Sequence, residues 1–216
     1  MKRFAFTACG VLVSCSSLFA GTIAHFDTSM GAFDVELYDS NTPITVANFL
    51  NYVNDGDYTS TFIHRSIPGF VVQGGGFGTD DTTDWFVPAD APILNEPGIS
   101  NLRGTIAMAK LDGDPNSATS EWFINLEDNL SLDSQNGGFT VFGHVIGDGM
   151  NVVDAIAALQ VYDASEIYGA FDNLPLTGPY FDTQHLVMVN SVTVPEPATL
   201  SLLALGALAM LRRRRA

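Results

Sequence analysis

The chain has 216 residues, with 24 acidic and nine basic side chains and a formal net charge of −15. Between residues 21 and 193 the only basic residues are Arg65, Arg103 and Lys110, against 23 acids, a net charge of −20 that argues against nucleic acid and anionic membranes as partners of this segment. Both cysteines, Cys9 and Cys15, precede it, which excludes a disulfide or thiol chemistry there.

The amino terminus has the pattern of a secretory signal. Lys2 and Arg3 precede the apolar run 4–13, and small residues follow as far as Ala20. This run is too short to span a bilayer, so we expect export and cleavage near Ala20, with residues 1–20 as the signal peptide. An alternative is a lipoprotein signal in which Cys15 carries the lipid, because residues 12–15 loosely resemble a lipobox.

The first elements of the exported part are a hairpin and a helix. Apolar and acidic residues alternate over 33–37, so residues 22–38 predict a β-hairpin with a turn at 29–31. A helix is then predicted, with Thr42 as its N-cap, Pro43 at its first position and Gly56 at its end.

The stretch 62–77 is the candidate site. We expect two strands joined by a turn at Pro68-Gly69, with Arg65 and Gln73 directed at one surface and Phe70 as an apolar floor. A cation between two isoleucines is unusual in a segment with three cations, which indicates a functional role.

The later elements predict a mainly β fold. After an irregular loop at 78–100, strands are expected at 104–109, 122–125, 137–143 and 185–192, a helix at 150–159, and a loop at 161–180, where no period is clear. Many short strands with two helices predict a closed antiparallel barrel that the helices cap.

The carboxyl terminus has three parts: Pro195-Glu196-Pro197, an apolar run of 14 residues, and Arg212 to Arg215. The run is short for a bilayer span of about 20 residues. The arrangement resembles the PEP-CTERM sorting signal, which implies recognition by an exosortase-like processing enzyme and at least transient membrane anchoring of residues 194–216. The alternative is a plain tail anchor with its arginines in the cytoplasm.

Several motifs, in their order and spacing, resemble those of bacterial cyclophilins: Phe62-Ile63-His64-Arg65, Pro68-Gly69-Phe70, Gln73-Gly74-Gly75, Gly104-Thr105-Ile106-Ala107-Met108-Ala109, Ser117-Ala118-Thr119-Ser120, Phe123-Ile124-Asn125 and Phe139-Thr140-Val141-Phe142-Gly143. The resemblance implies a peptidyl-prolyl cis-trans isomerase domain at 21–193, with an eight-stranded barrel, two capping helices and no metal or cofactor. Proline-containing segments of exported proteins would be its substrates, and we expect a monomer.

The residues themselves agree with this chemistry. Rotation of an X-Pro bond needs no nucleophile or metal, but it needs the amide resonance weakened against a barrier of about 18–20 kcal/mol. A guanidinium can donate to the prolyl carbonyl and to the nitrogen lone pair of the twisted amide. Arg65 is therefore the expected catalytic residue, together with Gln73 and Phe70. The resemblance implies a substrate-binding set of Val71, Met108, Ala109, Lys110, Glu121, Phe123, Leu132 and Phe139.

Four departures from the family pattern qualify this expectation. Glu121 stands where glutamine is usual and puts a carboxylate near the peptide groove, and Trp122 replaces phenylalanine. Ser131 or a neighbour falls where some members have the tryptophan associated with cyclosporin binding, and Phe139 replaces a pocket histidine. We expect weak cyclosporin sensitivity.

Other chemistries have less support. Residues 74–78 lack the lysine and spacing of a phosphate-binding loop, and the four histidines are too scattered for a zinc site. Residues 112–116 begin like a calcium loop, but Ser117 replaces its required glycine. The alternative function is a binding module that holds proline-containing segments at the cell surface without isomerising them.

Overall fold

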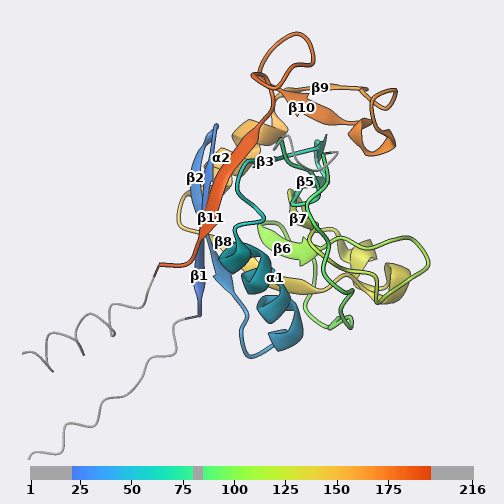
Figure 1. The fold of residues 1–216 in the computed structure, drawn as a ribbon. Helices are drawn as coiled ribbons and strands as arrows, with labels where there is room; N and C mark the ends of the chain where they lie inside the picture. Colours follow the sequence, from blue (N-terminus) through green and yellow to red (C-terminus); the bar gives the residue numbers. More distant parts are fainter. Residues whose placement is uncertain (1–20, 80–84, 196–216) are drawn as a thin grey trace, which may run out of the picture.

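A computed structural model describes residues 21–79 and 85–195 (Figure 1). In this part of the chain an antiparallel sheet of nine strands has the order β3-β11-β1-β2-β8-β6-β7-β5-β4. Its strands are β1 Ile23–Thr28, β2 Gly31–Leu37, β3 Thr61–Phe62, β4 Arg65–Ile67, β5 Val71–Gly74, β6 Thr105–Met108, β7 Trp122–Asn125, β8 Val141–Ile146 and β11 Met188–Thr193. The helices are α1 Pro43–Asp55 and α2 Gly149–Ala157.

The sheet curls back on itself. Its two end strands, β3 and β4, follow one another in the chain. β3 pairs with β11 at one end and β4 pairs with β5 at the other. Between them, Ile63 N–H donates to Val187 O at 2.9 Å and His64 N–H donates to Gln73 O at 3.2 Å. The prediction of a mainly β fold with two helices is confirmed, as a half-barrel of antiparallel strands (Figure 1).

The predicted first hairpin and first helix are confirmed. β1 and β2 pair from Ile23↔Glu36 to Thr28↔Gly31, and α1 begins at Pro43 and ends before Gly56, whose φ of 81° is left-handed. Thr42 occupies the N-cap position, but its hydroxyl donates to Tyr38 O at 3.5 Å and does not cap the helix.

Several predicted bounds differ from the structure. The strand expected at 185–192 begins at Met188, and the helix expected at 150–159 ends at Ala157. Residues 135–137 form a 3₁₀ turn, so the strand expected at 137–143 begins only at Val141. The loop expected over 161–180 contains a hairpin of β9 Gln160–Tyr162 and β10 Leu174–Leu176, at the top of Figure 1. It is a separate two-stranded sheet that packs against the end of the nine-stranded sheet, where Ser66 N–H donates to Asn173 O at 2.8 Å. A proline at the centre of β10 hid this strand from a search for alternating residues.

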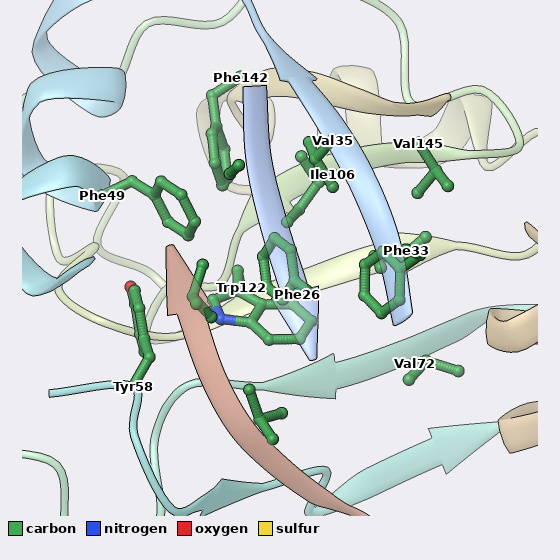
Figure 2. Packing of buried hydrophobic residues seen from close by; sticks show 14 of the residues in the cluster. Phe26, Phe33, Val35, Phe49, Tyr58, Val72, Ile106, Trp122, Phe142 and Val145 are labelled. Carbon is green, nitrogen blue, oxygen red and sulfur yellow. The ribbon is translucent and has the colours of Figure 1, made fainter. Parts of the chain in front are cut away.

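The main core is formed by side chains of the sheet strands together with the buried faces of α1 and α2. Phe26 stacks on Phe33 at a centroid distance of 4.8 Å, and Trp122 meets Phe26 edge-on at 5.2 Å (Figure 2). Trp122 is 1% exposed. The replacement of phenylalanine at this position therefore changes the core and not the peptide groove.

The predictions for the two ends of the chain, at residues 1–20 and 196–216, lie outside the described residues. Within 21–79 and 85–195, none of the helices has the length and apolar character needed to cross a membrane.

Candidate active site

The register of three neighbouring strands brings the predicted site residues to one face. β4 pairs with β5 so that Arg65 lies opposite Gln73, and β5 pairs with β7 so that Gln73 lies opposite Phe123. Because successive residues of a strand point to opposite faces, the residues between them, Val72 and Ile124, point into the main core. Arg65, Gln73 and Phe123 are thus presented together on the outer face.

A cavity of about 190 Å³ opens on this outer face. It is smaller than the roughly 300–1,000 Å³ of typical small-molecule sites, which suits a single residue of a peptide. Its lining combines one apolar surface with three polar side chains, and consists of Arg65, Phe70, Val71, Gln73, Ala109, Lys110, Phe123, Leu132 and Phe139. The structure therefore brings together nine of the eleven residues expected at the site.

The apolar wall is a small core of its own. Val71, Phe123 and Leu132 are 2–5% exposed and pack together, with Phe70 and Phe139 partly buried against them. Phe123 meets Phe139 edge-on at a centroid distance of 5.7 Å. A wall that is already packed holds its shape without a ligand. Binding of a ligand would therefore not cost the entropy of ordering these side chains.

The polar wall is a chain of hydrogen bonds. Arg65 Nη1 donates to Gln73 Oε1 at 3.1 Å, and Gln73 Nε2 donates to Glu121 Oε2 at 2.7 Å. His64, which is 1% exposed, places Nε2 at 3.5 Å from the same Glu121 oxygen. A guanidinium can only donate and a carboxylate can only accept, so the Gln73 amide satisfies both neighbours in one orientation.

The Glu121 carboxylate is ionised near neutral pH. Burial by itself raises its pKa, but the hydrogen bonds from His64 and Gln73, with the charges of His64 and Arg65, hold the pKa below its usual value. A fixed negative charge thus lies behind the Arg65–Gln73 pair.

Lys110 closes the opposite side of the cavity. Its Nζ donates to Asn136 O at 2.8 Å and to Gly138 O at 2.7 Å, and lies 4.8 Å from the centre of the Phe139 ring. Burial lowers the Lys110 pKa, although Asp114 opposes this effect. Lys110 therefore fixes the loop that carries Phe139 against the cavity.

The structure does not bring Met108 into the cavity, which corrects its expected place in the pocket. In β6, Ile106 and Met108 point into the main core, and Ala107 points to the cavity side, because side chains alternate along a strand. Glu121 also does not line the cavity: its side chain is joined to the site by the hydrogen bond from Gln73, and its backbone carbonyl accepts from Ala109 N–H at 2.9 Å.

Two supporting residues escaped the sequence reasoning. His64 is one of four histidines too scattered for a zinc site and has no predicted role, yet its Nε2 lies 3.5 Å from Glu121 Oε2. Asn129 Nδ2 donates to Phe70 O at 2.9 Å and to Asn125 Oδ1 at 2.8 Å, and so positions the floor of the cavity. Both residues lie in or near the family motifs, but only the tertiary structure shows which site residues their side chains contact.

Two features of this structure allow it to be compared with known proteins. They are the curled antiparallel sheet and the arginine beside a small apolar cavity. A crystal structure of a cyclophilin type peptidyl-prolyl cis-trans isomerase from Cryptosporidium parvum, determined in the presence of the dipeptide Ala-Pro, superposes with a TM-score of 0.62 at 20% identity. The match covers 81% of this chain and 99% of that one, which shows the same fold.

Sequence comparison identifies the family. Residues 23–170 match the family described as Cyclophilin type peptidyl-prolyl cis-trans isomerase/CLD. A peptidyl-prolyl cis-trans isomerase of Acinetobacter baylyi is 41% identical over 179 residues, 81% of this chain and 90% of that protein. Peptidyl-prolyl cis-trans isomerase B of Escherichia coli is 38% identical over 178 residues, 79% and 98% of the two chains. The chain belongs to the cyclophilin-type peptidyl-prolyl cis-trans isomerases, so the predicted enzyme class is confirmed.

A second match lies at the carboxyl terminus, where residues 193–215 match the PEP-CTERM protein-sorting motif. The resemblance inferred from Pro195-Glu196-Pro197, the apolar run and the arginines is therefore confirmed.

Proposed function

We propose that the 190 Å³ cavity isomerises X-Pro bonds, with the proline ring held against Phe70, Phe123 and Leu132 while Arg65 acts on the amide. The observation that carries this proposal is the contact between Arg65 and Gln73 at the edge of an apolar cavity. If the cavity holds the proline ring while the preceding carbonyl turns, binding energy lowers the barrier to rotation about the X-Pro bond.

Arg65 would supply the electrostatic part of catalysis. Gln73 takes a hydrogen bond from Nη1, and a guanidinium has five N–H donors, so others remain for the substrate. Donation to the proline nitrogen is favourable only when the amide is twisted, because the lone pair is delocalised in the planar ground state. This interaction therefore lowers the rotational barrier without strengthening the ground state equally.

The remaining residues would position the peptide. Gln73 keeps the guanidinium in place and presents its amide to the peptide backbone, and Val71, Ala109, Lys110 and Phe139 complete the cavity. Met108 would act only from the core, beneath Ala107 and Ala109. Closure of the curled sheet into a full barrel, through residues 63–64, would make this face rigid.

The biological role that we propose is folding assistance to exported proteins. The PEP-CTERM match and the signal-like residues 1–20 support export with at least transient association of residues 194–216 with the envelope membrane. The partners would be proline-containing segments of exported proteins and an exosortase-like enzyme that processes the tail. Residues 21–193 would act as a monomeric isomerase domain.

The competing function is a binding module that holds proline-containing segments without turning them over. An assay of proline-limited refolding and of a proline peptide separates the two, with the wild type compared with Arg65→Ala. We expect Arg65→Ala to lose about 100-fold or more in kcat/KM, the size of one lost transition-state hydrogen bond, with peptide binding weakened much less.

Arg103→Ala is the matched control, since it removes the same charge from the Asp154 ion pair, outside the cavity lining. A wild type that binds proline peptides without accelerating their isomerisation would establish the binding module instead.

A further inference from the structure

The geometry of Glu121 suggests a determinant of substrate choice, and this inference rests on the proposed function. Glu121 immediately precedes β7 and replaces the glutamine usual in the family. Its side chain is 35% exposed, although one of its oxygens contacts two site residues. It is therefore placed both to hold the site and to contact a ligand.

The two oxygens of the Glu121 carboxylate have different surroundings. Oε2 accepts from Gln73 Nε2 at 2.7 Å and lies 3.5 Å from His64 Nε2. Among the residues that the structure describes, no group is found hydrogen-bonded to Oε1. One oxygen is thus engaged in fixing Gln73, and the other retains its capacity to accept.

The Glu121 carboxylate packs closely against Gly76, which is itself buried. A Cβ atom at Gly76 would lie 2.6 Å from Glu121 Oε1, so any side chain there would displace the carboxylate. Gly76 is therefore matched to the position of Glu121.

The distance from the cavity suits a neighbour of the proline. Gln73 lines the cavity and contacts Glu121 directly. An extended peptide advances about 3.3 Å per residue, so a chain with its proline in the cavity passes the carboxylate within roughly one to three residues. A lysine or arginine there could reach Oε1.

We propose that Glu121 makes this isomerase selective for X-Pro bonds flanked by a lysine or arginine, through an ion pair between that side chain and Glu121 Oε1. The charge distribution favours the same ligands. The segment 21–193 carries a net charge of −20, which attracts cationic peptides at long range. Arg65 and Lys110 line the cavity and repel a cation there, so a cationic side chain of the peptide would lie beside the cavity, near Glu121, and not within it. The surrounding field steers cationic peptides to the site, and Glu121 would select them at close range.

A purely structural role for Glu121 makes a different prediction. If the carboxylate only held Gln73 and His64, its replacement by glutamine would change the rate for all peptides alike. Selectivity instead predicts a change that depends on the charge of the peptide.

The test uses three series of otherwise identical proline peptides, in which the residue before the proline, the one preceding that, or the one after the proline is lysine, norleucine or glutamate. The kcat/KM for isomerisation is measured by NMR exchange, and affinity by calorimetry, for the wild type and Glu121→Gln. We expect the wild type to favour lysine over norleucine about two- to fivefold in at least one series, and Glu121→Gln to lose this preference. Glu121→Asp, which keeps the charge, should retain part of it, and salt should reduce it.

Glu36→Gln is the matched control, because Glu36 is 37% exposed, lies 3.8 Å from a histidine, His144, and does not line the cavity. It should keep the preference for lysine. The proposal would be overturned if the wild type showed the same kcat/KM for all peptides. It would also be overturned if Glu121→Gln and Glu36→Gln lost the preference for lysine equally. A wild type without isomerase activity would refute the proposed function, while the affinities would still decide whether Glu121 selects cationic peptides.

Discussion

The two faces of strands β5 and β7 carry the same backbone register but have opposite properties. On the inner face Trp122 and Ile124 are 1% exposed and pack into the main core. On the outer face Gln73 and Phe123 border a cavity of about 190 Å³. The comparison shows how an active site can be placed on a rigid support: one face supplies the folding energy, and the other can leave space unfilled and hold charged groups.

The largest expected effect breaks the inner face. Trp122→Ala should lower the free energy of unfolding by about 3–5 kcal/mol, because it leaves a large cavity against Phe26. Phe123→Ala, from the outer face, should cost less stability, since its ring already borders open space, and should lose more activity. For both variants, urea denaturation gives the free energy of unfolding, and kcat/KM gives the isomerase activity. An equal stability loss with equal activity loss would contradict the division between the faces.

A smaller effect is expected at Gly75, which follows Gln73 of the outer face by two residues and packs against Trp122 of the inner face. Gly75 has a φ of +82°, and a Cβ atom there would lie 2.7 Å from Ser120 O and from the Trp122 ring. We expect Gly75→Ala to lower the free energy of unfolding by about 1–3 kcal/mol and to reduce activity through displacement of Gln73. Gly113→Ala is the control, since its φ is also positive, at +76°, with no atom within 4 Å of the added group.

The smallest expected effect is a pH dependence that comes from the outer face. Because the folded-state pKa of Glu121 is lowered, its ionised form contributes stability above the unfolded value of about 4.3, and this contribution is lost as the pH falls through the lowered pKa. Between pH 6 and pH 3 the wild type should therefore lose slightly more stability than Glu121→Gln, by less than about 1 kcal/mol for a partly exposed group. Parallel urea midpoints for the two proteins over this range would contradict the prediction.

Much of the fold could be predicted because its signals are local. Alternating residues at 33–37 predicted β2, and Pro43 and Gly56 bounded α1, since backbone preference and burial act over a few residues. β10 could not be predicted, because its strand pairs with β9 across an intervening segment and has a proline at its centre.

The amino-acid sequence by itself determined the family, the conspicuous position of Arg65 and most of the cavity lining, because motif order and residue type are properties of the chain. Only the tertiary structure decided that Met108 and Trp122 belong to the core, and that His64, Gln73 and Arg65 form one hydrogen-bonded chain with Glu121. The reason is physical: strand register assigns each side chain to a face, and the contact between Gln73 and Glu121 joins residues 48 positions apart.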